Sequence, residues 1–341
     1  MSVNWSQSRV LVTGGGGFLG SHVVEKLRAA GCRDLFVVRS REYDLTREEQ
    51  VVRLFRQHPG DIVVHMAGLV GGIGANQAYP AEFFYQNLMM GALTMHYAWK
   101  SGARKFVCSG AGCGYPEHAP LPLKETFFWQ GFPQQESAPY SLAKRMLQVQ
   151  SMAYWRQYQF PAIVTIPGNI YGPYDNFDLE NAHVVPALVR KFVEATCNGG
   201  SSGEPVVVWG SGKPTRDFVY AGDVAAGILR AAEVYDRAEF VNISSGEEHS
   251  IREVIEAIAE LTGFRGKIVW DTTRPDGQAR RLFDISKAQQ ELGYRARTSL
   301  HDGLKLTIDW YRRHRAEARN VVAVQAAAAQ SGLYQEQRWK A

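Results

Sequence analysis

The first half of the chain alternates short apolar runs with longer segments of helical periodicity. The apolar runs are nearly continuous, which is typical of strands that are covered on both faces. They occupy residues 10–13, 35–38, 62–65, 106–109 and 162–166. Between and after them, helices are expected at residues 22–30, 47–58, 81–100 and 140–158. The repeated strand–helix order predicts an α/β fold of the Rossmann type, a doubly wound parallel sheet with helices on both faces.

The pattern changes after Tyr171, where residues 172–177 have the composition of a loop. A helix and a strand within residues 223–243 are expected to return to the first sheet. The other predicted elements are a strand at 206–209 and helices at 186–196, 251–262 and 301–313. We therefore expect a dinucleotide-binding domain, a smaller C-terminal α/β substrate-binding domain and a tail. The dinucleotide-binding domain is expected to comprise residues 1–172 and 214–244, and the substrate-binding domain residues 173–213 and 245–316. The tail is expected at residues 317–341.

Composition narrows the class of function. A length of 341 residues exceeds what one hydrophobic core usually holds, in line with two domains. The net charge of +4 is small and dispersed, which argues against a nucleic-acid partner and suits an anionic small substrate. No apolar run is long enough to span a membrane and the polar start has no signal sequence, so we expect a cytoplasmic protein with no membrane partner. The four cysteines lack zinc-ligand spacing, so no metal site is expected.

A glycine-rich turn connects the first strand to the first helix. Gly14, Gly17 and Gly20 follow a G-x-x-G-x-x-G spacing. Glycines at these positions let the backbone turn tightly and approach a pyrophosphate, and the helix N-terminus offers free N–H groups and the positive end of its dipole. The turn therefore predicts an NAD(P)-binding site that also includes Phe18 and Leu19.

Two arginines near the end of the second strand bear on the choice of cofactor. An acidic residue at this place binds the ribose 2′-hydroxyl of NAD, whereas an arginine accommodates the 2′-phosphate of NADP. Arg39 and Arg41 follow the strand, and no carboxylate stands at its tip. The sequence therefore favours NADP. NAD stays open, because two arginines at a loop are also compatible with a solvated surface.

A tyrosine and a lysine follow the fourth strand in a Y-x-x-x-K arrangement. Tyr140 and Lys144 are four residues apart, so a helix places them on one face. An ammonium beside a phenol is expected to lower the phenol pKa and to make it an acid or base near neutral pH. The pair is common on its own, but together with the glycine turn it indicates proton transfer beside a nicotinamide.

Several other short segments form a more specific pattern. They are Val70-Gly-Gly-Ile73, Tyr79-Pro80, Tyr85-Gln86-Asn87, Cys113-Gly-Tyr115-Pro116, Asn169-Ile-Tyr-Gly-Pro173, Asp175-Asn176-Phe177, His183-Val-Val-Pro186, Val208-Trp-Gly-Ser-Gly212, Arg216-Asp-Phe218 and Pro275-Asp-Gly277. With the glycine turn and the Tyr140–Lys144 pair, they resemble the extended short-chain dehydrogenase/reductase family over roughly residues 9 to 315. Within that family the likeness is to the branch that converts GDP-4-keto-6-deoxyhexoses.

The resemblance implies an NADP-dependent epimerase/reductase that acts on a nucleotide-linked sugar. A 4-keto group acidifies the protons at C3 and C5, and the resemblance makes Cys113 and His183 the pair that removes and returns them. It makes Tyr140 the acid of the reductive step and Lys144 its electrostatic helper. A thiolate and an imidazole suit these roles. Outside the resemblance, a lone cysteine is more often a small buried apolar residue and a lone histidine is more often structural.

The resemblance also implies the walls of the site. Besides the glycine turn, the arginines and the Tyr140–Lys144 pair, the implied cofactor-binding residues are Ala67, Gly68, Pro167, Asn169 and Ile170. The implied substrate-binding residues are Asn169, His183, Lys191, Trp209, Arg216 and Arg280. Arginine suits a diphosphate because its planar fork binds two oxygens at once.

The chain departs from the family pattern at two positions. The family places a serine or threonine four residues before the tyrosine of the Tyr-Pro pair, and here that position is Ala111. Loss of one such hydroxyl donor costs about 2.7–4 kcal/mol of transition-state stabilisation, which puts the hydride step in doubt. Ser109 or a water molecule are candidate substitutes. The second departure is Lys191, where the pattern favours an arginine, so the charge remains while the planar fork is lost.

Three functions remain open on the sequence. The first is an epimerase/reductase of a GDP-4-keto-6-deoxyhexose. The second is a nucleotide-sugar epimerase that retains its NAD(P) and performs little net reduction. The third is a protein that has lost catalysis and only binds the nucleotide sugar, which Ala111 favours and the retained Tyr140, Lys144, Cys113 and His183 oppose.

The helices at 81–100 and 140–158 carry more apolar side chains than one sheet-facing stripe requires. Methionines and aromatic residues are frequent on both. We therefore predict a homodimer that associates through these two helices, in keeping with the family resemblance. The alternative is that the same residues form a broad core-facing surface.

Overall fold

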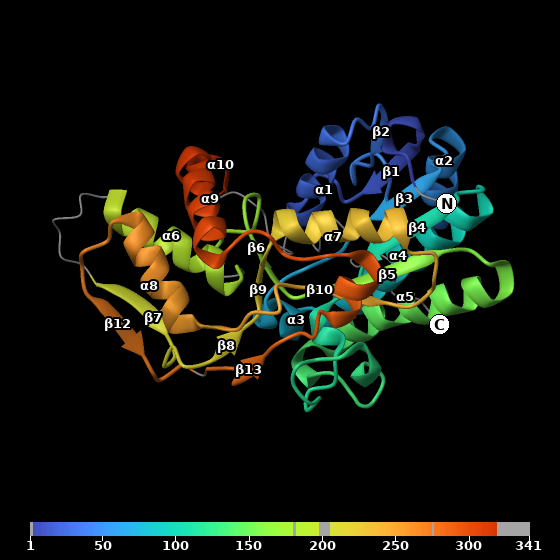
Figure 1. Ribbon diagram of the computed structural model, residues 1–341. Helices are drawn as coiled ribbons and strands as arrows, with labels where there is room; N and C mark the ends of the chain where they lie inside the picture. Colours follow the sequence, from blue (N-terminus) through green and yellow to red (C-terminus); the bar gives the residue numbers. More distant parts are fainter. Residues whose placement is uncertain (1–2, 180–181, 198–204, 275, 319–341) are drawn as a thin grey trace, which may run out of the picture.

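A six-stranded parallel sheet forms the centre of the larger lobe of the computed structural model (Figure 1). The structure describes residues 3–179, 182–197, 205–274 and 276–318. The strands of this sheet are β1 (Arg9–Thr13), β2 (Asp34–Val37), β3 (Ile62–His65), β4 (Lys105–Ser109), β5 (Ala162–Pro167) and β10 (Val241–Ile243). Their order is β10–β5–β4–β3–β1–β2, and all neighbours are parallel. The predicted fold class is confirmed.

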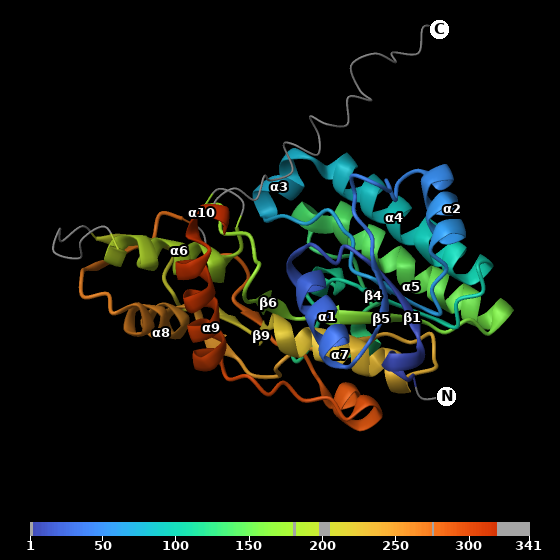
Figure 2. The same ribbon diagram turned by 90° about the horizontal axis from the view of Figure 1, so that it is seen from above.

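Helices cover both faces of the sheet (Figure 2). On one face lie α1 (Phe18–Ala29) and α7 (Ala221–Val234), and on the other lie α2 (Glu48–Gln57), α4 (Pro80–Lys100) and α5 (Ala138–Tyr158). Alternate residues of β1 face opposite ways, because Val10 and Val12 pack with the first pair whereas Leu11 packs with the others. This two-sided burial explains why the strands are continuous apolar runs. The strand order reverses between β1 and β3, where doubly wound folds bind ligands.

The smaller lobe has its own hydrophobic core. Its elements are α6 (Val184–Cys197), β7 (Val206–Trp209), α8 (Ile251–Thr262), β12 (Ile268–Asp271), α9 (Leu300–Arg313) and α10 (Arg315–Ala318). Strands β7 and β12 pair in parallel beside the three longer helices. Helix α8 begins at a capping box in which Ser250 and Glu253 satisfy each other's backbone N–H groups, and it ends at Gly263 in the left-handed region.

Short elements lie where the two lobes meet and around the rim. Strand β6 (Asn169–Tyr171) pairs with β9 (Phe218–Tyr220), and β8 (Thr215–Arg216) lies between β11 (His249–Ser250) and β13 (Arg280–Arg281). The remaining short elements are η1 (Trp5–Gln7), α3 (Ile73–Ala78), η2 (Gly112–Gly114), η3 (Glu125–Phe127), η4 (Gln135–Ser137) and η5 (Ala288–Leu292). Residues 215–220, expected within the dinucleotide-binding domain, therefore pair outside the six-stranded sheet.

Some expected boundaries differ from those observed. The first helix is predicted from residue 22 but begins at Phe18, because Gly17 serves as its N-cap and the glycine turn leads directly into it. The tail is predicted from residue 317, but Glu317 and Ala318 belong to α10, and Ala318 is buried. Residues 319–341 of the predicted tail lie outside the described residues. Among the helices that are described, none combines the length and apolar character needed to cross a membrane.

Candidate active site

The glycine turn after β1 packs too closely for side chains at two of its positions. Gly14 has a φ of +65°, and a Cβ on it would lie 2.5 Å from the backbone nitrogen of Ala67. A Cβ on Gly20 would lie 2.0 Å from the Gly14 carbonyl oxygen. The N-cap residue Gly17 has no side chain to satisfy the first N–H groups of α1, so these groups can receive an anion. The turn therefore has the geometry of a diphosphate cradle.

The two arginines after β2 take different positions. The guanidinium of Arg39 lies over the glycine turn, since a Cβ on Gly16 would be 2.2 Å from its Nη1. The side chain of Arg41 is 84% exposed and forms an ion pair with Glu42 at 3.5 Å. The structure thus brings Arg39 to the turn and leaves Arg41 in solvent.

The loop after β3 supports the turn from the other side. Ala67 N donates to Thr13 Oγ1 at 3.3 Å, and Thr13 Oγ1 is 2.8 Å from His65 Nδ1. Burial of His65, with a smaller contribution from the charge of Lys144, lowers its pKa to about 3, so the imidazole is neutral in the folded protein. Gly68 lies against Lys144, because a Cβ on this glycine would be 3.3 Å from Lys144 Nζ.

Tyr140 and Lys144 lie on the first two turns of α5. The Lys144 ammonium is 6.0 Å from the centre of the Tyr140 ring and donates to the Ser109 carbonyl oxygen at 3.3 Å. Tyr140 also packs edge-on against Phe83, with ring centroids 6.1 Å apart. The helix therefore brings the pair to the carboxyl end of β4, beside the loop that follows β3.

The electrostatics of this pair correct the expectation from sequence. The pKa of Tyr140 is raised rather than lowered, chiefly because burial disfavours the phenolate, and also because the thiolate form of Cys113 carries a like charge. Burial lowers the pKa of Lys144, and the nearby thiols oppose that shift only in part. A desolvated ammonium at this distance does not outweigh the desolvation of the phenol.

Cys113 lies in the turn η2 that follows β4, and its side chain is half-buried. Its charge acts on Tyr140, Lys144, Arg145 and Arg281, which places all four side chains around the thiol. The other three cysteines are also free thiols, and two of them are buried. The structure therefore gathers Cys113, Tyr140 and Lys144 into one site.

His183 immediately precedes α6 in the smaller lobe, and its carbonyl accepts the first helical bond from Ala187 N at 3.2 Å. Its side chain is solvent-exposed, yet the surrounding protein lowers its pKa by desolvation. Among the described residues, no hydrogen bond, ion pair or ring contact joins His183 to Cys113 or Tyr140. His183 therefore lies in the smaller lobe, whereas Cys113, Tyr140 and Lys144 lie together in the larger lobe.

Two other predicted substrate residues meet in the smaller lobe. The ring of Trp209, at the end of β7, is 5.6 Å from Lys191 Nζ and 5.0 Å from the guanidinium carbon of Arg274. Lys191 also donates to the Val207 carbonyl oxygen at 3.0 Å. Trp209 is 61% exposed, so it presents an aromatic face flanked by two cations.

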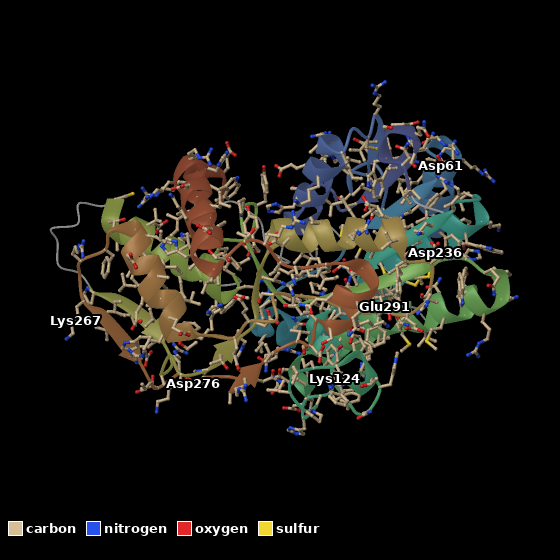
Figure 3. The ribbon with its side chains drawn as sticks, in the orientation of Figure 1. Asp61, Lys124, Asp236, Lys267, Asp276 and Glu291 are labelled. Carbon is tan, nitrogen blue, oxygen red and sulfur yellow. The ribbon has the colours of Figure 1, made fainter. Side chains whose placement is uncertain are left out.

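The turn after Trp209 is fixed by an aspartate labelled in Figure 3. Asp276 accepts hydrogen bonds from Ser211 N at 2.6 Å and from Ser211 Oγ at 2.7 Å. Gly210 fits beside it with a φ of +80°, since a Cβ there would lie 2.3 Å from Asp276 Oδ1. The segment after β7 is thereby held to the segment before β13.

The predicted arginines of β8 and β13 do not all face the same way. Arg216 pairs with Arg281 in the β8–β13 register, and its pKa is lowered by burial and by the like charge of Arg281. Arg280 points away and forms a bidentate ion pair with Glu248, at 2.8 and 2.6 Å. Arg281, which the motif did not single out, donates to the Gly112 carbonyl at 2.7 Å. Alternation along β13 accounts for this division.

Asn169 begins β6 close to the ends of the central strands. Its backbone N and its Nδ2 both donate to the Asp217 carbonyl oxygen at 3.1 Å. The Asp217 carboxylate in turn accepts bonds from Ser244, Ser245 and from backbone N–H groups of the segments after β10 and β13. Pro167 ends β5 and is buried, and Ile170 packs against the core between β5 and α7. The Asp217 network was not foreseen from its motif.

Ala111 is buried at the start of the Cys113 turn. The hydroxyl of Ser109, one candidate substitute for the missing donor, donates to the Gly110 carbonyl at 3.1 Å. The Ser109 hydroxyl is therefore already used in a hydrogen bond to the backbone. A water molecule as the substitute donor stays a prediction.

A Rossmann sheet with a diphosphate-cradling glycine turn and a tyrosine–lysine pair at its carboxyl edge defines a dinucleotide-dependent enzyme. Residues 10–244 match the NAD dependent epimerase/dehydratase family. The chain belongs to this family.

Relatives and solved structures are similar over nearly the whole chain. The sequence is 40% identical to GDP-L-fucose synthase 1 of Arabidopsis thaliana, with 91% of this chain and 95% of that protein covered. It is 35% identical to the GDP-L-fucose synthase of Escherichia coli, with coverages of 90% and 97%. The NADP-bound GDP-L-fucose synthetase of Naegleria fowleri superposes with a TM-score of 0.87 at 28% identity, covering 94% and 96%.

Proposed function

We propose that this protein is an NADP-dependent epimerase/reductase that converts a GDP-4-keto-6-deoxyhexose. The observation that carries the proposal is the meeting of Cys113, Tyr140 and Lys144 at the carboxyl edge of the sheet, beside the glycine turn. A carbon base and an oxygen acid in one site are what combined epimerisation and reduction require. The whole-length similarity to GDP-L-fucose synthases supports the GDP-sugar assignment.

The residues present fit NADP. The cradle of Gly14, Gly17 and Gly20 can take the diphosphate, and Arg39 lies over it where a 2′-phosphate would be neutralised. Bound NADPH supplies the hydride that reduces a C4 ketone. Lys144 and Asn169 both lie near the carboxyl ends of the central strands, and Arg41 is too exposed to contribute equally.

We assign the proton transfers to three side chains of this chain. The Cys113 thiolate takes a proton from C3 or C5, so an S–H bond forms while the C–H electron pair moves into an enolate on the C4 oxygen. His183 returns a proton on the opposite face, and its lowered pKa makes the protonated imidazole a stronger acid. Tyr140 gives its proton to the C4 oxygen in the reductive step.

The test supplies purified protein with GDP-4-keto-6-deoxy-D-mannose and NADPH in D2O. We expect stoichiometric loss of nicotinamide absorbance and solvent deuterium at C3 and C5 of the product. Cys113→Ser is expected to abolish deuterium uptake. The absence of both NADPH oxidation and deuterium uptake in the wild type would refute the proposal. Deuterium uptake without NADPH oxidation would show an epimerase that performs no net reduction.

Three further proposals concern domain organisation, assembly and location. Residues 1–172 with 214–244 are proposed to bind the cofactor, and 173–213 with 245–316 the sugar nucleotide. A homodimer through α4 and α5 is supported by the exposed apolar side chains Phe84, Tyr85, Val149, Met152 and Tyr158. A reducing, cytoplasmic setting is proposed because Cys113 has to stay a free thiol. Light scattering that gives a monomer mass at every concentration would refute the dimer.

A further inference from the structure

The guanidinium of Arg145 lies beneath the turn that carries Cys113. Arg145 follows Lys144 on α5 and is only 4% exposed. Its Nε donates to the Gly114 carbonyl oxygen at 2.6 Å, and its Nη1 donates to the Gly131 carbonyl oxygen at 3.0 Å. Because Gly114 is the residue after Cys113, Arg145 fixes the backbone of the turn next to the thiol.

Arg145 is a buried cation without a matching carboxylate. None of the ion pairs formed within the described residues includes it. Its Nη2 is buried and has no hydrogen-bond partner in the part of the chain that is described. The rings of Phe128 and Trp129 lie 5.1 and 5.3 Å from the guanidinium carbon. They favour a cation there but leave its charge uncompensated, and an unpaired buried charge is strongly disfavoured.

The ionisable group that acts on Arg145 is Cys113. Burial lowers the pKa of Arg145, and the charge of the Cys113 thiolate opposes that shift. The thiol is also faced by Lys144 from α5 and by Arg281 from β13, which donates to the other carbonyl that flanks the cysteine. If Tyr140 were deprotonated, it would carry a negative charge like that of the Cys113 thiolate. Three cations and one neutral phenol thus surround one potential anion.

We propose that Arg145 is a positioning residue for the Cys113 thiolate, which it orients through the Gly114 carbonyl and stabilises with a buried, uncompensated positive charge. Of the three cations, Arg145 is the one flanked by two aromatic rings, and its burial weakens the screening of its charge by water. The role rests on the proposed function, in which this thiolate removes a carbon-bound proton beside a ketone. Arg145 itself touches no reacting atom.

The test measures how fast iodoacetamide alkylates Cys113 across a pH series, by mass spectrometry of the Cys113 peptide. Arg145→Met is expected to move the midpoint of the rate profile upward by about one pH unit or more. Arg145→Lys, which keeps the charge, should stay closer to the wild type. Arg156→Met, on the exposed last turn of the same helix, should overlay the wild type. An unchanged midpoint in folded Arg145→Met overturns the proposal, because a purely structural role would alter stability without moving it.

A second variant covers the case in which Arg145→Met fails to fold. Arg145→Gln also removes the charge but keeps an N–H donor for the Gly114 carbonyl. An alkylation midpoint above that of the wild type supports the proposal, and an unchanged midpoint overturns it. Neither measurement uses sugar or NADPH. Failure to convert GDP-4-keto-6-deoxy-D-mannose would therefore refute the proposed function, but it would not change the outcome of the alkylation test.

Discussion

The Lys144 ammonium lies 6.0 Å from the centre of the Tyr140 ring and donates a hydrogen bond to the Ser109 carbonyl oxygen. With the pKa of Tyr140 raised and that of Lys144 lowered, chiefly by burial, the phenol is neutral near neutral pH. A neutral phenol has a proton to give. The geometry therefore favours Tyr140 as the donor to a ketone oxygen over Tyr140 as a base.

Replacing Tyr140 with phenylalanine should separate the two half-reactions. The hydride step is expected to slow by about 10²–10⁴-fold, because the ketone oxygen loses its acid. Exchange of the C3 and C5 protons should persist, since Cys113 is untouched. Single-turnover NADPH oxidation and deuterium uptake, measured on the same sample, check this. Equal loss of both signals would contradict the division of labour.

Ala111→Ser restores the hydroxyl that the family pattern contains. If the missing donor limits reduction, the variant should accelerate NADPH oxidation, by at most about 10²–10³-fold. Position 111 adjoins the Cys113 turn, so a new hydroxyl would enter the site without a change of backbone. Stopped-flow absorbance is the measurement. No acceleration would mean that another group already donates.

Arg39→Ala should reduce the preference for NADPH over NADH by about tenfold or more, because a charge-assisted contact to the 2′-phosphate is lost. Arg41→Ala should change the same ratio less, since Arg41 is exposed and paired with Glu42. Ratios of kcat/KM for the two cofactors give the answer. Equal effects of the two variants would show that Arg39 is not the discriminating residue.

His65 should make the protein less stable in acid. Its pKa is about 3 in the fold and near 6.5 when unfolded, so the unfolded chain binds the extra proton and stability falls as the pH falls from 6.5 toward 3. Between about pH 7 and about pH 5 this one group contributes a loss of about 2 kcal/mol. Urea unfolding of wild type and His65→Asn at both pH values measures it. Between the two pH values, the free energy of unfolding of the variant should fall by about 2 kcal/mol less than that of the wild type. Equal decreases would contradict the lowered pKa of His65.

The sequence predicted the sheet well because its strands other than the edge strand β2 are buried on both faces and therefore form unbroken apolar runs. The glycine turn was predictable for a steric reason, since Gly14 and Gly20 leave no space for a Cβ. Tyr140 and Lys144 were predictable because helical spacing alone places them on one face. These features depend on local rules.

Other parts of the site depend on tertiary contacts that no local pattern encodes. Strands β8 and β13 are two residues each, too short for a periodicity, so the choice between Arg280 and Arg281 depends on their register. Arg145 belongs to an ordinary helical pattern, and only the packing of the loop that carries Phe128 encloses it. The raised pKa of Tyr140 also follows from burial, which spacing does not reveal.

Asp217 forms hydrogen bonds with several segments near the junction of the two lobes. One carboxylate ties the chain after β10 to the chain after β13, and the carbonyl of the same residue holds Asn169. Three segments that are far apart in the sequence therefore depend on one residue for their hydrogen bonds. Replacing Asp217 with alanine would leave several buried donors without an acceptor, and the junction of the lobes would lose stability.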